Sequence, residues 1–284
     1  MWHSPLARLS GDDPLMTHHA SQAAAPLTDV QSSADHRQVP IDKVGVKNVV
    51  YPIRLRTPTG GEQHTVATVN MYVSLPHHQK GTHMSRFLEV LNEHAQEIDP
   101  TNVIAICRDI RERLHAADAH LELSFDYFIN KPAPVTRMKG LMAYRVSFEC
   151  ASNGSDDFVL GVKVPATSLC PCSKAISAYG AHNQRCEIEA RVRIRKMMWI
   201  EELVKFCEDA ASAPVYSVLK RPDEKHVTEQ AFDHPKFVED IVRDLAVMLD
   251  NEPRILWYTV NSENFESIHS HNAYASIVKD KRTA

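Results

Sequence analysis

Residues 166–189, ATSLCPCSKAISAYGAHNQRCEIE, hold the densest group of metal-binding side-chain types in the sequence. Cys170 and Cys172 flank a proline, and His182 follows Cys170 by twelve positions. Thiolate and imidazole are strong ligands for zinc and related divalent ions, and a loop can bring such residues together. The pattern predicts a metal site, against the alternative of two cysteines in a tight turn and a solvated histidine.

The spacing differs from that of a structural zinc site. Structural sites use four ligands, usually from C-x2-C-type pairs, and this sequence has no second cysteine or histidine pair at that spacing. A site with fewer strong protein ligands leaves a coordination position for water. The pattern therefore favours a catalytic metal over a structural one. Cys186 begins a strand-like run and is interpreted as structural.

Two glutamates in polar or helical segments are candidate partners of this site. Glu224, just before the start of a predicted long helix, would complete a Cys/His/Glu metal set, or is simply favoured by the helix N-terminal dipole. Glu239 points away from the apolar stripe of that helix, where a solvated i,i+4 pair with Arg243 is the alternative.

A third segment, NSENFESIHSHNAY (261–274), falls in the turn between the last two predicted strands. It carries four titratable side chains: Glu263, Glu266, His269 and His271. Histidines and carboxylates clustered at a strand end suit acid/base catalysis, and a solvated polar hairpin is the alternative interpretation.

Periodic patterns predict the elements that position these residues. Alternation of apolar and polar residues predicts strands over 47–57, 64–75, 120–129, 141–150, 157–166, 186–196, 255–262 and 271–279. Apolar stripes at helical spacing predict helices over 87–98, with Ser85 as cap, over 103–114, and near 199–211 and 226–250.

The element order strand, strand, helix, helix, strand, strand occurs twice. In the predicted strand 186–196 one face is apolar and the other heavily charged, so helices should cover only one side of an antiparallel sheet. The sequence thus predicts an α+β fold of two tandem antiparallel modules, residues 41–153 and 154–284. Residues 1–40, rich in Ala, Ser, His, Asp and Pro, are predicted to be a flexible tail.

Composition narrows the classes of partner. The formal net charge of −4 over 284 residues argues against a nucleic-acid or membrane-surface binder, while a polyphosphate ligand needs only a few placed cations. No apolar run approaches the ~20 residues of a membrane helix, and the start lacks a secretory signal. We therefore expect a cytosolic protein with reduced cysteines, of which Cys107, Cys150 and Cys207 are core residues.

Several separate motifs resemble prokaryotic GTP cyclohydrolase IB. They are SLCPCSK followed by GAHNQR, GTHMSR at 81–86, RPDEKHVTE at 221–229 and the NFESIHSHNAYA ending. The resemblance runs from about residue 40 to the C-terminus. It implies a tunnelling fold with two ββααββ modules per subunit and a homotetramer with active sites at subunit interfaces. It also implies conversion of GTP and water to 7,8-dihydroneopterin triphosphate and formate, the first step toward folate and related pterins and deazapurines.

The same resemblance implies roles for individual residues. Its metal ligands correspond to Cys170, His182 and Glu224, which would hold a divalent ion such as Zn, Mn or Fe. Glu239 matches the glutamate that anchors the guanine base. The remaining matches are two acid/base candidates and a second active-site cysteine: Glu266, His269 and Cys172.

Two other functions stay open at this point. A related tunnelling-fold nitrile reductase would share the fold and the purine anchor, but Cys170 or Cys172 would form a covalent adduct and NADPH would be required. A non-catalytic metal-binding or redox module built on Cys-Pro-Cys is the second alternative, although C-x-C pairs are less usual redox motifs than C-x-x-C.

Overall fold

The computed structural model describes residues 29–94, 98–100 and 102–283. Its strands form one antiparallel sheet in the order β1-β2-β3-β4-β5-β6-β8-β9, with β7 paired to β5. The strands are β1 (Ile41–Arg56), β2 (Glu62–Leu75), β3 (Ala119–Pro132), β4 (Lys139–Ser152), β5 (Asp156–Leu169), β6 (Asn183–Ile194), β7 (Ala213–Pro214), β8 (Ile255–Asn264) and β9 (Ala273–Asp280). The helices are α1 (Met84–His94), α2 (Val103–Arg113), α3 (Pro171–Ile176), α4 (Ile200–Ala210), α5 (Arg221–Asp233) and α6 (Val238–Asn251).

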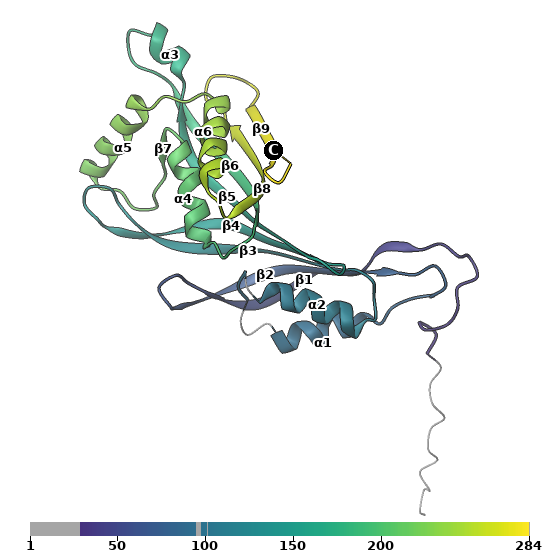
Figure 1. The fold of residues 1–284 in the computed structure, drawn as a ribbon. Coiled ribbons are helices and arrows are strands. Elements are labelled where there is room, and N and C mark those ends of the chain that lie inside the picture. Colours follow the sequence, from purple (N-terminus) through teal and green to yellow (C-terminus); the bar gives the residue numbers. More distant parts are fainter. Residues whose placement is uncertain (1–28, 95–97, 101, 284) are drawn as a thin grey trace, which may run out of the picture.

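The sheet has one apolar face that continues across both predicted modules. One row of paired residues runs through six strands: Val69, Leu123, Phe148, Leu160, Val192 and Tyr258. All six side chains are buried in a single core cluster, to which α1, α2, α4 and α6 also contribute residues. Figure 1 shows where these four helices lie along the sheet. The neighbouring row is mostly polar and begins with Asn70, Glu122 and Glu149. This alternation confirms the predicted α+β fold with helices on one face of an antiparallel sheet.

The helix predicted near 226–250 is wrong, because two helices occupy this stretch. α5 ends at Asp233, and α6 begins at Val238 after Pro235. A proline lacks the backbone N–H of a helix interior and disfavours helical geometry at the preceding residue. Glu224 consequently lies within the first turn of α5, and not ahead of the helix.

Several other element boundaries differ from the prediction. α1 begins at Met84, so Ser85 lies inside the helix and does not cap it. β1 begins at Ile41, six residues before the predicted start, because a register shift between Val46 and Val49 interrupts its alternation. Asn48 sits in this irregularity with a φ of 58°. At the end of α1, Ile98 does not continue the predicted helix, and its backbone N–H donates to the Arg54 carbonyl at 2.8 Å.

The last part of the expected N-terminal tail is attached to the fold. The N–H of Asp35 donates to the His78 carbonyl at 2.9 Å, and the N–H of Lys80 donates to the Ser33 carbonyl at 3.0 Å. Residues 1–28 of the expected tail lie outside the described residues.

The two halves of the chain are interlocked. Between them lies the tight turn from β4 to β5, where Gly154 adopts a φ of 96°. Side chains of the β3–β4 hairpin reach α4 of the second half: Lys131 Nζ and Tyr144 Oη each lie 2.7 Å from Glu208 Oε1. The boundary expected at residues 153–154 therefore falls in a hairpin whose strands are paired, and not in a linker.

Candidate active site

Cys170 lies at a corner where β5 ends and the short helix α3 begins. Its sulfur accepts a hydrogen bond from the Ser173 N–H at 3.4 Å, and Pro171 occupies the first helical position, where its missing N–H costs nothing. The backbone N–H of Cys170 donates to the His182 carbonyl at 3.1 Å. This bond closes the base of the loop between β5 and β6, so the backbones of Cys170 and His182 lie opposite each other.

The six cysteines fall into two classes by burial. Burial raises the pKa of Cys107 and of Cys186 to about 12, and it also raises the pKa of Cys150 and Cys207. By contrast, Cys170 is half-buried and Cys172 is exposed. The thiolate is the form of cysteine that binds metals and acts as a nucleophile. The four buried thiols are shielded from solvent and have raised pKa values, so only the two cysteines of the CPC motif are accessible for chemistry.

A buried glutamine connects His182 with Glu266. His182 Nδ1 lies 3.0 Å from Gln184 Oε1 and 3.2 Å from Ser267 Oγ. The other amide atom of Gln184, Nε2, donates to Glu266 Oε1 at 3.2 Å. His182, a candidate metal ligand, and Glu266, a candidate acid/base residue, are far apart in sequence but hydrogen-bond to the same Gln184 side chain. Sequence reasoning missed Gln184, because a lone glutamine in a strand carries no motif signal.

The segment that leads into α6, and so to Glu239, is held by hydrogen bonds to the residues just before Cys170. The segment before α6 is hydrogen-bonded to the end of β5: the Lys236 N–H donates to the Leu169 carbonyl at 3.0 Å, and Ser168 Oγ donates to the Lys236 carbonyl at 3.0 Å. Glu239 follows in the first turn of α6 and is exposed. The alternative pair with Arg243 is absent from the described structure, where Arg243 faces Asp240 at 4.0 Å.

Glu224 is not brought to Cys170 and His182. It is exposed in the first turn of α5, whereas the opposite end of this helix contacts α3 through Lys174, which stacks 4.2 Å from the Phe232 ring. The eight residues from Glu224 to Phe232 span ~12 Å of helix. Across residues 29–94, 98–100 and 102–283, no three His, Cys, Asp or Glu side chains gather as a metal site.

The residue before Glu224 anchors this end of α5. The Asp223 side chain is buried and accepts hydrogen bonds from the N–H groups of Val135, Thr136 and Lys220 and from the Thr136 hydroxyl. Burial alone would raise the pKa of Asp223, but these hydrogen bonds hold it well below its usual range. The position of Glu224 is therefore tied to the β3–β4 turn.

The turn that carries His269 is solvent-exposed. His269 and His271 stack with ring centroids 5.4 Å apart, and neither joins the Gln184 hydrogen bonds. Glu263 accepts a hydrogen bond from Asn272 Nδ2 at 2.7 Å within the same hairpin. Glu266 and His182 thus contact the same Gln184 side chain, whereas His269 contacts His271 in the exposed turn.

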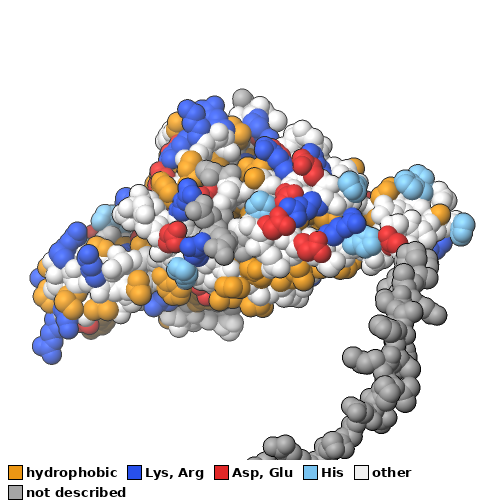
Figure 2. All heavy atoms as spheres, turned by 90° about the horizontal axis from the view of Figure 1, so that it is seen from below, with side chains coloured by type: hydrophobic (Ala, Val, Ile, Leu, Met, Phe, Trp, Pro, Cys, Tyr) orange, Lys and Arg blue, Asp and Glu red, His pale blue; other side chains and the backbone are white. Residues whose placement is uncertain are grey.

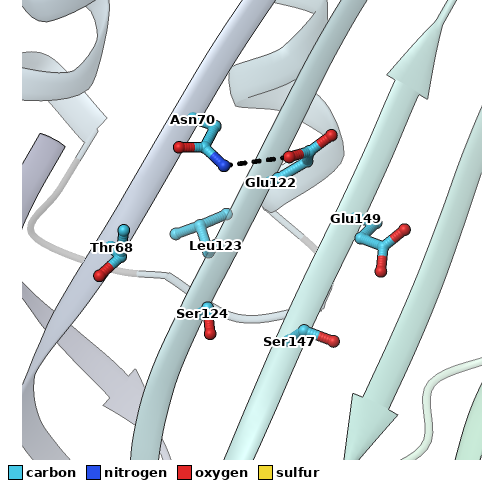
Figure 3. A pocket seen from close by; sticks show the side chains of 7 residues that line it. All are labelled: Thr68, Asn70, Glu122, Leu123, Ser124, Ser147 and Glu149. Carbon is cyan, nitrogen blue, oxygen red and sulfur yellow. Dashed lines mark hydrogen bonds between the residues drawn. The ribbon is translucent and has the colours of Figure 1, made fainter. Parts of the chain in front are cut away.

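The polar face of the sheet contains a separate hollow of about 310 Å³ (Figure 3). Asn70 Nδ2 donates to Glu122 Oε2 at 3.1 Å there, and Glu149 lies across the next strand. Arg191 neutralises Glu149 at 2.6 Å. In the view from below, acidic, basic and histidine side chains mix with hydrophobic ones (Figure 2). None of the predicted site residues lines this hollow.

Comparison with known proteins identifies the family. The family model described as type I GTP cyclohydrolase FolE2 matches residues 27–275. A GTP cyclohydrolase FolE2 of Methylobacillus flagellatus is 55% identical over 258 residues, covering 90% of this chain and 97% of that protein. The FolE2 of Syntrophobacter fumaroxidans is 56% identical over 257 residues, covering 90% of this chain and all of that protein.

A solved structure supports the fold independently. Uricase from Arthrobacter globiformis superposes with a TM-score of 0.51 at 7% sequence identity, covering 86% of this chain and 94% of that one. At such low identity the likeness concerns the fold alone, and it confirms the tunnelling fold. Among the described residues, no helix is both long and apolar enough to cross a membrane. The matches over nearly the whole chain establish that this protein belongs to the type I GTP cyclohydrolase FolE2 family.

Proposed function

We propose that this chain converts GTP and water to 7,8-dihydroneopterin triphosphate and formate with the help of a divalent metal held by Cys170 and His182. Family membership makes the chain a GTP cyclohydrolase, an enzyme that acts on a cyclic amidine C–N bond. The observation that supports the proposed site is the backbone hydrogen bond from the Cys170 N–H to the His182 carbonyl, which places an accessible cysteine and a histidine opposite each other at the base of one loop.

The donor chemistry of this corner fits a metal ion. Thiolate and imidazole suit zinc, iron or manganese, and His182 Nε2 makes no hydrogen bond within the described residues. Glu224 is the proposed third ligand, because it matches the family motif and its exposed carboxylate is likewise unpaired within the described chain. When bound, such an ion supplies Lewis acidity that activates water near neutral pH.

The remaining site residues would hold the purine and move protons. A carboxylate at Glu239 can accept two parallel hydrogen bonds from the guanine ring and exocyclic N–H groups. Its exposure in the first turn of α6, beside the end of β5, supports this role. Glu266 and His269 would transfer protons as C8 leaves as formate, and Cys172 would be the second active-site cysteine.

The two alternative functions lose their support. A nitrile reductase and a non-catalytic metal or redox module share the CPC motif, but neither accounts for matches to GTP cyclohydrolases over nine tenths of the chain.

A homotetramer with active sites at subunit interfaces completes the proposal. The described helices that contribute to the core cluster, α1, α2, α4 and α6, pack on the apolar face of the sheet, and Glu224 does not join Cys170 and His182 in a metal-binding group within the described chain. Both features are consistent with a site completed on assembly. Light scattering coupled to size exclusion should give a mass near four times 32.0 kDa. A monomer that turns over GTP at full rate would contradict this part.

The direct test of the activity is formate release from GTP by metal-reconstituted protein. We expect formate together with a pterin that fluoresces after oxidation, both lost when a chelator is added. Intact GTP in the presence of zinc, manganese and iron in turn would refute the proposed function.

A further inference from the structure

Gln184 occupies a position where a polar side chain requires a specific reason. Its side chain points to the apolar face of β6, in line with Cys186 and Ile188, and is 8% exposed. A buried amide needs hydrogen-bond partners for both of its polar atoms. Gln184 has them: Oε1 faces His182 Nδ1 at 3.0 Å, and Nε2 faces Glu266 Oε1 at 3.2 Å.

These two contacts determine which nitrogen of His182 carries the proton. An ionised carboxylate only accepts hydrogen bonds, so Glu266 requires the NH2 group of Gln184 on its side. The carbonyl oxygen of the amide then faces His182, and Nδ1 must donate to it. Ser267 Oγ, 3.2 Å from the same nitrogen, can accept as a second partner. The neutral ring therefore keeps its lone pair on Nε2.

We propose that Gln184 is a positioning residue that fixes His182 as an Nε2 metal ligand and couples it to Glu266. The inference rests on the proposed function, in which Cys170 and His182 hold the metal. A ligating histidine that donates its other N–H to an oriented acceptor binds metal more tightly, and loss of such a partner costs roughly 10–100-fold in affinity. Through the same amide, Glu266 is held beside the metal site.

The test compares two substitutions that separate the two contacts. Gln184→Leu removes both, and Gln184→Glu keeps an acceptor for His182 while removing the donor to Glu266. Zinc affinity, measured by competition with a chromophoric chelator, should fall roughly 10–100-fold in Gln184→Leu. It should stay within a few-fold of wild type in Gln184→Glu, whose kcat for formate release should nevertheless fall.

A matched control is available in the other half of the sheet. Gln63 also uses both amide atoms, bonding the backbone N–H and carbonyl of Phe128 at 2.7 and 2.8 Å. Gln63→Leu should keep wild-type zinc affinity. Equal zinc affinity in Gln184→Leu and wild type would overturn the inference.

Two further measurements keep the inference distinct from the proposed function. If Cys170→Ala and His182→Ala retain zinc, the metal site itself is wrong; if they lose it and Gln184→Leu does not, only the positioning role fails. Should Gln184→Leu not fold, 15N-histidine NMR of the metal-free wild type decides the question. His182 should be protonated on Nδ1, and a ring protonated on Nε2 would overturn the assignment.

Discussion

At the residue scale, burial separates thiols that can react from thiols that pack. The core holds Cys107, Cys150, Cys186 and Cys207, whereas Cys170 and Cys172 face a loop at the end of β5. Desolvation raises the pKa of each buried thiol, so at neutral pH little thiolate forms inside the protein. Chemistry at sulfur is thereby confined to the CPC motif.

Alkylation of the native, metal-free protein should follow this division. Iodoacetamide is expected to modify Cys170 and Cys172 quickly and the four buried cysteines only after unfolding, because attack requires an accessible thiolate. Peptide mass spectrometry measures the modified fraction at each position. Bound zinc should protect Cys170. Rapid native labelling of Cys186 would contradict the assignment of accessible thiols.

Residue types and spacing identified the CPC loop and Glu266, because these residues lie in recognisable segments. Gln184 could not be found in this way: its partner Glu266 is 82 positions away, and only the pairing of β6 with β8 brings them together. The separation of Glu224 from Cys170 likewise depends on where α5 packs. Contacts between side chains that are distant in sequence depend on the tertiary structure, which local sequence patterns do not encode.

At the element scale, ion pairs with little solvent exposure join helices to the sheet. Lys131 and Glu208, with side chains 11% and 14% exposed, join the β3–β4 hairpin to α4 at 2.7 Å. Burial lowers the pKa of Lys131, and the neighbouring Glu208 charge offsets part of that shift. Strand alternation predicted both strands of this hairpin, but their docking under a helix of the other half was not visible in the sequence.

Removing one partner of this pair should be costly. Glu208→Ala leaves the Lys131 ammonium buried without its counter-ion, so we expect a loss of about 3 kcal/mol in the free energy of unfolding. Asp209→Ala, on the same helix, breaks the exposed pair with Lys205 and leaves the direct Lys131–Glu208 contact in place, so it should cost less than about 0.5 kcal/mol. Urea denaturation measures both. Equal effects of the two substitutions would contradict the buried-pair interpretation.

A second group of ion pairs lies at the turn from α6 to β8, and its contribution to the free energy of unfolding should depend on pH. Hydrogen bonds from Arg254 lower the pKa of Glu252 to about 2 from its ordinary value of 4.5, and the same guanidinium reaches Glu202 of α4 at 2.7 Å. Because the folded-state pKa is lowered, the stabilisation is present above pH 4.5 and is lost as the pH falls toward 2.

Glu252→Gln should therefore destabilise the protein by about 1–2 kcal/mol at pH 7, after allowance for solvent screening. The difference in unfolding free energy between variant and wild type should shrink steadily as the pH is lowered below 4.5. Urea titrations at a series of pH values measure it. A difference that stays constant down to pH 3 would show that the carboxylate charge is not responsible.

At the scale of the whole molecule, one sheet carries two different surfaces. Its apolar face is continuous from β2 to β8 and is covered by α1, α2, α4 and α6 (Figure 1), while the row on its other face begins with the polar residues Asn70, Glu122 and Glu149. The alternation of apolar and polar residues that produces these two surfaces could be predicted from the sequence, most clearly in β6. The irregularity at Asn48 and the helix break at Pro235 were missed, because periodicity alone averages over single residues.

We propose that GTP turnover depends on a metal ion held by Cys170 and His182. The most direct test measures formate release from GTP by metal-reconstituted Cys170→Ala beside wild type and Cys186→Ala, which removes a buried thiol from the adjoining strand. We predict that Cys170→Ala releases no formate, whereas wild type and Cys186→Ala do so at comparable rates. A fully active Cys170→Ala enzyme would contradict the claim.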